Sequence, residues 1–375
     1  MALVYVIVVA ALLLALAIPY LTTSYYVAIA TQVLYFGLLA MSIDLLGGYL
    51  GLMPLGHAGI MGVAAYVMGY LVSKSHWAWP SAVAIALVTT LLVSLVFGLL
   101  AVRTTGIFFV MITMAEGMLV WGLAYRWSSV TGAENGIRGV ARPDFATLYW
   151  QYYYLALGVF VACAVLLTLV VRSPFGLVLK GIRESESRMR TLGYNVTLHK
   201  LLAFAVSGLF AAIAGVLYAW YNQFISPSAI NITASTEGIL MVVLGGPGTL
   251  LGPVLGAGVI VFVKNILSVY VTRWPSIMGL IFIVVVLFAQ DGILGALRRA
   301  RLRFTRSEPV QTQGDAAWDA LGLENTSSRS SSVWACWSPR AHRPARLAPR
   351  RNRQVRSKLA SSRRPRVLRR PAAMT

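Results

Sequence analysis

The sequence predicts an all-α, polytopic membrane protein with about ten transmembrane helices. Hydrophobic residues make up 58% of the 375 residues and charged residues only 12%, whereas a water-soluble domain carries about 25% charged residues. The mean hydropathy is correspondingly high, at +0.73. Long apolar runs recur along the chain, and a helix needs ~20 such residues to cross a hydrocarbon core of ~30 Å. Together these observations exclude a water-soluble class of protein.

The sequence contains ten apolar runs. They fall near residues 2–22, 26–46, 56–73, 80–101, 106–124, 150–171, 201–221, 235–246, 249–271 and 275–291. The first run lacks a basic segment and a small-residue cleavage site, which favours a retained span over a signal peptide. The run at 235–246 is short for a full crossing and ends in the helix-breaking sequence Gly245-Gly246-Pro247-Gly248. Irregular backbone at membrane depth must be buried in protein or line a wet cavity.

A charged insert, Arg172–Lys200, separates the runs at 150–171 and 201–221. Ile182, Met189 and Leu192 are spaced to line one side of a short helix within it. A short amphipathic helix between two spans predicts a cytoplasmic surface on which a soluble partner docks. Its charged residues are six bases and two acids: Arg172, Lys180, Arg183, Arg188, Arg190, Lys200, Glu184 and Glu186.

The ends of this predicted helix carry recognisable signals. Ser173 followed by Pro174 is typical of a helix start, and Gly193 is typical of a helix end. Asn195 or Thr197 is expected to cap the following span.

The basic loops predict the orientation. If the charged insert is cytoplasmic, ten alternating spans place both termini in the cytoplasm. Four arginines then follow the last span, as the positive-inside rule prefers: Arg298, Arg299, Arg301 and Arg303. The predicted outer loop also holds basic residues, namely Arg126, Arg138 and Arg142.

The chain is predicted to divide into a transmembrane domain, residues 1–297, and a basic disordered tail, residues 298–375. The tail holds 19 Lys and Arg against four acids, so +15 of the net charge of +20 lies there. It has two interpretations. It is either a polybasic segment that binds anionic lipid or the product of translating GC-rich DNA in the wrong frame. In neither case does the charge indicate nucleic-acid binding.

Glycines are concentrated where helices are expected to pack or break. Gly248, Gly252 and Gly256 fall four residues apart, a spacing that lets helix backbones approach closely. Gly245 and Gly246 belong, with Gly248, to the helix-breaking sequence at 245–248. A second dense cluster, residues 47–57, predicts an irregular turn beside a translocation route.

Ionisable residues inside spans are costly and usually face a bundle interior or a wet path. Glu116, in the run at 106–124, is the first candidate for a pathway residue, and His57 and Glu237 are further candidates. Asp44, near the inner interface, and Lys264, in the run at 249–271, are similar cases. Each has a structural alternative, such as a helix cap or a helix contact.

Several catalytic signals are missing from the sequence. It contains no GxxxxGK[ST] phosphate loop, no HExxH and no GxSxG motif. Cys163 and Cys336 form no disulfide framework, and no His/Cys cluster predicts a metal site. The chain is therefore expected to be no enzyme and to bind no ATP, cofactor or metal itself.

Five segments, in order from about Tyr26 to Leu297, closely resemble the LivM-type permeases of branched-chain amino-acid ABC importers. Each segment alone is a moderate signal, whereas five in the same order are a strong one. They are SIDLLGGYLGLMPLGHAGIMGVAAY (42–66), VRTTGIFFVMITMAEGML (102–119), SSVTGAENGIRGVARPDF (128–145), RSPFGLVLKGIRESESRMRTLGYNVTLHKLLAFAVSG (172–208) and LMVVLGGPGTLLGPVLGA (240–257).

The resemblance implies an ABC importer permease fold in a bacterial inner (plasma) membrane and a division of labour among subunits. Two different permeases, this one and a LivH-like partner, form the channel, and a periplasmic binding protein delivers the solute. Two ATPase subunits that use ATP and Mg dock from the cytoplasm. By the same resemblance, the ATPase-coupling residues are Gly181, Ile182, Arg183, Glu184, Glu186, Arg188, Met189, Leu192 and Gly193.

The chain departs from related families at two places. Its insert lacks the Glu-Ala-Ala triplet of other bacterial importers, and its tail extends well beyond the final span. Two alternatives to branched-chain amino-acid import stay open. One is a same-family permease for urea or short amides, because members similar to this family are assigned to those solutes, and the other is an ion-coupled secondary transporter. The latter predicts paired broken helices in two repeats, for which the glycine clusters near Gly245 and Gly47 are the candidates. A membrane enzyme lacks a catalytic constellation.

Overall fold

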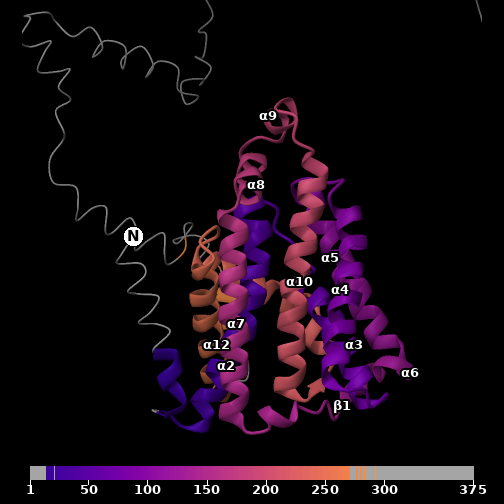
Figure 1. Ribbon diagram of the computed structural model, residues 1–375, viewed down its shortest axis with the longest axis vertical. Helices are drawn as coiled ribbons and strands as arrows, with labels where there is room; N and C mark the ends of the chain where they lie inside the picture. The colour runs from indigo at the N-terminus through magenta and orange to yellow at the C-terminus, as the bar shows by residue number, and fades with distance from the viewer. Residues whose placement is uncertain are drawn as a thin grey trace, which may run out of the picture. The chain divides into compact units, whose positions relative to one another are not determined.

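The computed structural model describes residues 14–20, 22–270, 276, 277, 279, 280, 283 and 292. The chain divides into two units, Met1–Arg306 and Ser307–Thr375, and every described residue lies in the first. The described part is mostly helical (Figure 1), which confirms the helical class. The predicted tail, residues 298–375, lies outside the described residues, so its boundary and its disorder stay predictions.

Among the described residues, six helices are long and apolar enough to cross a membrane. Two further apolar helices, α3 (His57–Ser73) and α11 (Ile232–Gly245), are shorter. The six are α2 (Ser24–Asp44) continued by the π-helical turn η1 (Leu45–Leu50), α4 (Trp79–Ala101), α5 (Ile107–Arg126), α7 (Tyr149–Arg172), α10 (Val196–Asn222) and α12 (Leu251–Tyr270).

These eight helices correspond to eight of the predicted runs. The run at 2–22 is described only at 14–20 and at residue 22, and the run at 275–291 only at scattered positions. A count of about ten spans therefore stays a prediction.

The centre of the bundle is formed by α2, α3 and α10. In the most apolar stretch of each helix, 67% of the residues are buried in α2 with η1 and 67% in α10. In α4 only 22% are buried. Small residues make this packing possible. Any side chain at Gly215 of α10 would overlap the backbone carbonyl of Met61 in α3. The outer helices α4, α5 and α7 consequently present apolar side chains outward, as helices in contact with lipid do.

A short ribbon and several small turns close one end of the bundle. Between α5 and α7 lie α6 (Ser128–Thr131), η2 (Ala133–Asn135), β1 (Ile137–Arg138) and η3 (Asp144–Ala146). Between α10 and α11 lie β2 (Phe224–Ile225) and η4 (Pro227–Ile230). β1 and β2 pair antiparallel, with Ile137 opposite Ile225 and Arg138 opposite Phe224.

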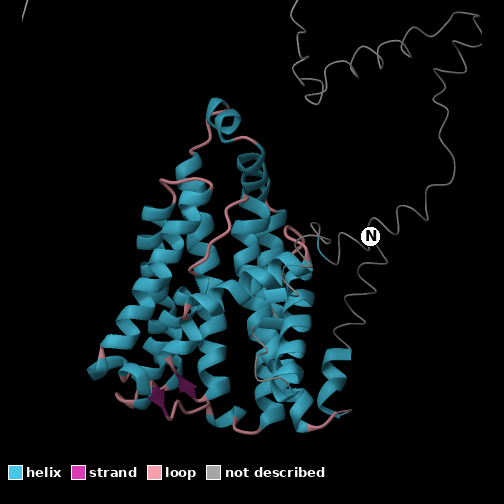
Figure 2. Cartoon of the chain, turned by 180° about the vertical axis from the view of Figure 1, so that it is seen from behind, coloured by secondary structure: helices cyan, strands magenta, loops and turns pink. Residues whose placement is uncertain are grey.

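The charged insert lies at the other end of the bundle, because it joins the end of α7 to the start of α10. Figure 2 shows the ribbon and the insert at opposite ends. The insert forms two helices, α8 (Pro174–Glu184) and α9 (Glu186–Thr191). A single helix with Ile182, Met189 and Leu192 on one side is therefore wrong. Ser185 adopts an extended backbone, φ −164° and ψ 105°, which ends α8, and Leu192 is 66% exposed.

Candidate coupling site and buried polar groups

The helix pair α8–α9 packs against the bundle with one apolar face. Val178, Leu179 and Ile182 of α8 are buried, whereas Leu177 is 65% exposed. Met189 of α9 is also buried, and its sulfur lies so close to Gly181 that any side chain there would contact it at 2.7 Å. The pair thus presents Leu177 and Leu192 to the outside while its other face is held on the bundle.

Local hydrogen bonds explain where α9 begins and ends. The hydroxyl of Ser185 accepts a hydrogen bond from the backbone N–H of Arg188 at 3.3 Å, which caps the start of α9. At the end, Gly193 has φ +88°, a conformation that favours glycine. The N–H groups of Gly193 and Tyr194 donate to the carbonyls of Arg190 and Met189, the pattern of a Schellman cap.

Polar contacts join the insert to the spans. The guanidinium of Arg183 donates to the carbonyl of Gly48 in η1. Glu186 of α9 pairs with Lys200 in the first turns of α10, where the lysine is only 3% exposed. The ammonium group of Lys180 lies 5.3 Å from the centre of the Tyr49 ring. These contacts join α8–α9 to both η1 and α10.

Beside Arg183, the side chain of Asp44 joins η1 to the loop between α11 and α12. Asp44 is fully buried. Its Oδ1 accepts from the N–H of Gly248 at 2.6 Å and its Oδ2 from the N–H of Leu250 at 3.1 Å. A carboxylate that accepts N–H groups just before a helix satisfies donors that the helix leaves unpaired. Asp44 thereby fixes the start of α12 against the end of α2.

The glycines singled out in the sequence divide between this loop and the helix contact beyond it. α11 ends at Gly245, and Gly246 and Gly248 lie in the loop, where Gly248 has φ +83°. Side chains at Gly252 or Gly256 of α12 would overlap the backbone of α11. The two helices therefore approach more closely than residues with a Cβ would permit.

The three predicted pathway residues lie in different surroundings. Glu237 of α11 forms an ion pair with Lys264 of α12, with Nζ 3.0 and 2.9 Å from the two carboxylate oxygens. Glu116 of α5 is 7% exposed, and its Oε1 has no hydrogen-bond partner among the described residues.

His57 is 1% exposed and its Nε2 lies 2.6 Å from the hydroxyl of Ser207. That hydroxyl donates to the carbonyl of Ser42 at 2.6 Å, and it has one proton only. Nε2 of His57 must therefore carry a proton, which it donates to the hydroxyl oxygen of Ser207. The chain of bonds connects α3, α10 and α2.

Sequence reasoning did not find the contacts that join separate segments. Asp44 and Gly248 are 204 residues apart, and Arg183 and Gly48 are 135 residues apart. The only signal in the sequence is the high density of glycine near Gly47 and near Gly245. It indicates a broken helix at each position, but it does not indicate that the two breaks lie side by side.

A family profile described as the permease component of the branched-chain amino acid transport system matches residues 25–289. The chain belongs to this family. The matched region contains both short helices, the charged insert and all six long helices except Ser24, the first residue of α2.

Curated relatives are similar over most of the permease. It is 24% identical over 316 residues to the high-affinity branched-chain amino acid permease protein LivM of Salmonella typhimurium strain LT2, covering 77% of this chain and 74% of the relative. LivM of Escherichia coli K12 is 25% identical over 317 residues, covering 77% and 75%.

A different import system is also represented among the relatives. The autoinducer 2 import system permease protein LsrC of Klebsiella pneumoniae is 28% identical over 208 residues, covering 51% of the permease and 56% of the relative. No solved structure matches the permease. Membership of this family together with the six apolar helices makes it a membrane protein.

Proposed function

We propose that this permease carries branched-chain amino acids inward across a bacterial inner membrane as one subunit of an ABC importer. In this assembly a second, LivH-like permease completes the channel, and a periplasmic binding protein delivers the solute. Two separate ATPase subunits use ATP and Mg. The similarity to two LivM proteins over three quarters of their length supports this choice of solute.

The observation that carries the proposal is the charged insert and its attachment to the spans. α8–α9 projects at one end of the bundle (Figure 1) and exposes Leu177 and Leu192. In this proposal Leu177 and Leu192 supply apolar contacts to the docked partner, and the exposed Glu184 and Arg188 supply polar ones. Arg183 and Glu186 connect this surface to η1 and α10, so force applied by an ATPase would be passed on to the spans. In this proposal the insert and both termini are cytoplasmic.

The assignment of pathway residues is also a proposal. Glu116 is the best candidate, because its carboxyl group is buried and Oε1 has no partner in the described part of the chain. Glu237 and His57 already have partners, Lys264 and Ser207, which favours roles in holding helices together.

The test is reconstitution of the permease, its neighbouring permease and two ATPases in proteoliposomes with the binding protein. Uptake of labelled leucine that requires ATP and all subunits is the expected result. Uptake by the permease alone, driven by an ion gradient, would instead establish the secondary transporter. Copurification with Leu192→Glu examines the docking surface: the ATPases are expected to be lost, whereas Ser187→Glu on the same segment serves as the control.

A second cargo is favoured by the LsrC relatives, whose name concerns autoinducer 2 import. Uptake of each labelled solute is measured in the same proteoliposomes with the same binding protein, so that the uptake of different solutes can be compared directly. Uptake of autoinducer 2, a short amide or urea without uptake of leucine would replace the amino acid in the proposal.

A further inference from the structure

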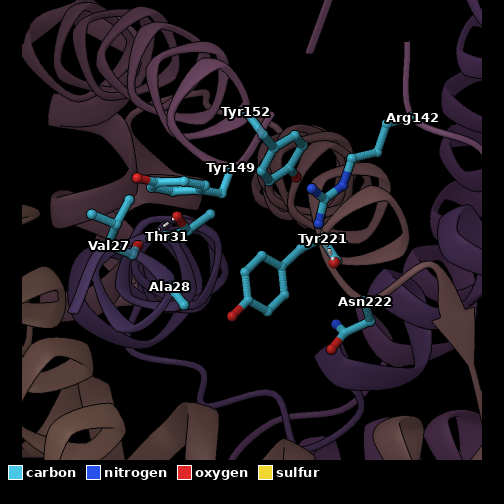
Figure 3. Close-up of a pocket in the computed structure, with 8 residues that line it drawn as sticks. All are labelled: Val27, Ala28, Thr31, Arg142, Tyr149, Tyr152, Tyr221 and Asn222. Atoms are coloured by element: carbon cyan, nitrogen blue, oxygen red, sulfur yellow. Dashed lines mark hydrogen bonds between the residues drawn. The ribbon is translucent and has the colours of Figure 1, made fainter. Parts of the chain in front are cut away.

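A cavity of about 330 Å³ lies at the end of the bundle away from the charged insert (Figure 3). Its walls come from the start of α2, the segment before α7, the start of α7 and the end of α10. Known small-molecule sites begin at about 300 Å³. The cavity therefore has room for a solute the size of an amino acid.

Arg142 supplies the charge in this cavity. Its Nε donates to the carbonyl of Trp220 at 2.9 Å and its Nη2 to the carbonyl of Tyr221 at 2.8 Å. The guanidinium also lies 4.8 Å from the centre of the Tyr152 ring. These three contacts hold it in one orientation, and Figure 3 shows it directed into the space between Tyr152 and Tyr221.

The contacts leave part of the guanidinium unused. Arginine has five N–H donors, and the two bonds to α10 occupy two of them. Within the described ranges, Nη1 has no hydrogen bond and Arg142 forms no ion pair with a carboxylate. A half-buried guanidinium that is held rigidly and retains free donors is suited to bind a carboxylate through two N–H groups.

Apart from Arg142, the lining of the cavity is uncharged. Val27 and Ala28 of α2 and the rings of Tyr149, Tyr152 and Tyr221 supply apolar surface, whereas Thr31 and Asn222 are polar. The apolar surface suits a short aliphatic body, and the lining offers no second charge for a diacid or a phosphate.

We propose that this cavity binds the carboxylate of a small aliphatic amino acid through Arg142 at the outer end of the permease. The identity of the solute rests on the proposed function, whereas recognition of its carboxylate rests on the cavity alone. The site receives the solute before it reaches the centre of the bundle, because it lies among the outer ends of α2, α7 and α10.

The rival reading is purely structural. A cation at the carbonyl end of a helix stabilises the helix by itself, and Arg142 does this for α10. A variant that fills the cavity while leaving Arg142 in place separates the two roles. Ala28→Leu is such a variant, since Ala28 lines the cavity and takes no part in the bonds to α10.

The experiment measures binding of tritiated L-leucine to the full permease complex in nanodiscs, without the binding protein, by scintillation proximity. Arg142→Gln and Ala28→Leu are expected to weaken leucine binding at least tenfold. Arg126→Gln, an exposed arginine at the end of α5, is expected to leave it unchanged. L-leucinamide, which lacks the carboxylate, is expected to compete at least tenfold less well with the wild-type complex.

The proposed site is wrong if Ala28→Leu binds leucine with wild-type affinity, or if leucinamide competes as well as leucine does. It is also wrong if the wild-type complex binds no leucine. If Arg142→Gln does not fold, Ala28→Leu and leucinamide still decide. Measurement of ATP-driven leucine uptake keeps the two proposals apart. If ATP-driven leucine uptake is observed without leucine binding to the complex, only the proposed site is wrong. If neither uptake nor binding is observed, the proposed solute is wrong as well.

Discussion

Two buried carboxylates in the apolar helices have opposite surroundings. Asp44 accepts two backbone N–H groups that hold the start of α12, whereas Glu116 has an oxygen without a partner in the described ranges. An ionised carboxylate without a partner is costly in an apolar interior. The stabilising role therefore belongs to Asp44, and Glu116 is the residue whose presence needs a functional reason.

Glu116→Gln tests that reason, because the amide has the same shape without the charge. We expect unchanged or slightly raised thermal stability and uptake reduced several-fold, since no contact is lost but the polar group of the proposed path is altered. Glu134→Gln, at an exposed position in η2, is the control. Wild-type uptake by Glu116→Gln at all leucine concentrations would assign Glu116 to helix contacts.

Asp44→Asn is expected to destabilise the protein by roughly 1–3 kcal/mol, because the amide nitrogen would face one of two backbone donors and leave it unpaired. The melting temperature of purified protein in detergent is the measurement. Asp144→Asn, the same substitution at an exposed residue, should leave it unchanged. Equal melting temperatures for both variants would show that the bonds from Gly248 and Leu250 contribute little.

Among the elements, the contact between η1 and the loop that precedes α12 depends on the absence of side chains. A Cβ at Gly48 would overlap the amide nitrogen of Gly248 and a carboxylate oxygen of Asp44, and would lie 2.7 Å from the Cα of Gly248. Two of these atoms belong to the backbone of Gly248. The third, Oδ1 of Asp44, could move away only by losing its hydrogen bond from Gly248.

Gly48→Ala is therefore expected to abolish stable expression or to lower the melting temperature strongly. Gly122→Ala is the matched control, since nothing lies within 4 Å of the added carbon. Because glycine inside a helix costs roughly 0.5–1 kcal/mol relative to alanine, the control should be neutral or stabilising. Similar melting curves for the two variants would contradict this contact.

The attachment of the charged insert leads to a prediction about coupling. Arg183→Ala removes the bond to Gly48 but leaves the exposed Leu177 and Leu192 in place. We expect ATPase subunits to copurify normally while leucine uptake per ATP hydrolysed falls several-fold. Arg190→Ala removes a largely exposed arginine 3.7 Å from Glu186 and should change little, as surface pairs contribute ~0–1 kcal/mol.

Local signals in the sequence predicted elements better than contacts. Pro174, Gly193 and Asn195 mark helix ends as expected, and the Asn195 side chain accepts from the N–H of Leu198 at 3.1 Å. The sequence does not predict the break at Ser185, because a serine is compatible with a helix interior as well as with a helix start. Contacts such as Asp44 with Gly248 depend on tertiary packing, which no local pattern contains.

At the scale of the whole molecule, the orientation is the property on which the proposed mechanism depends. In a background with Cys163 and Cys336 replaced by alanine, Leu192→Cys and Ser129→Cys place single thiols at exposed positions at the two ends. A membrane-impermeant maleimide added to intact cells is expected to label only Ser129→Cys. Permeabilised cells without the ATPase subunits provide the control, because position 192 is then uncovered and both variants should react. Labelling of Leu192→Cys from outside intact cells would invert the topology.

The helix α10 connects the charged insert at one end of the bundle to Arg142 at the other. α10 has 27 residues, a length of roughly 40 Å at 1.5 Å per residue. Lys200 in its first turns is bonded to α9, and the carbonyls of Trp220 and Tyr221 near its far end hold Arg142. In the proposed mechanism, ATPase subunits that displace α9 would tilt α10 as one rigid rod, and the two carbonyl groups that hold Arg142 would move with it.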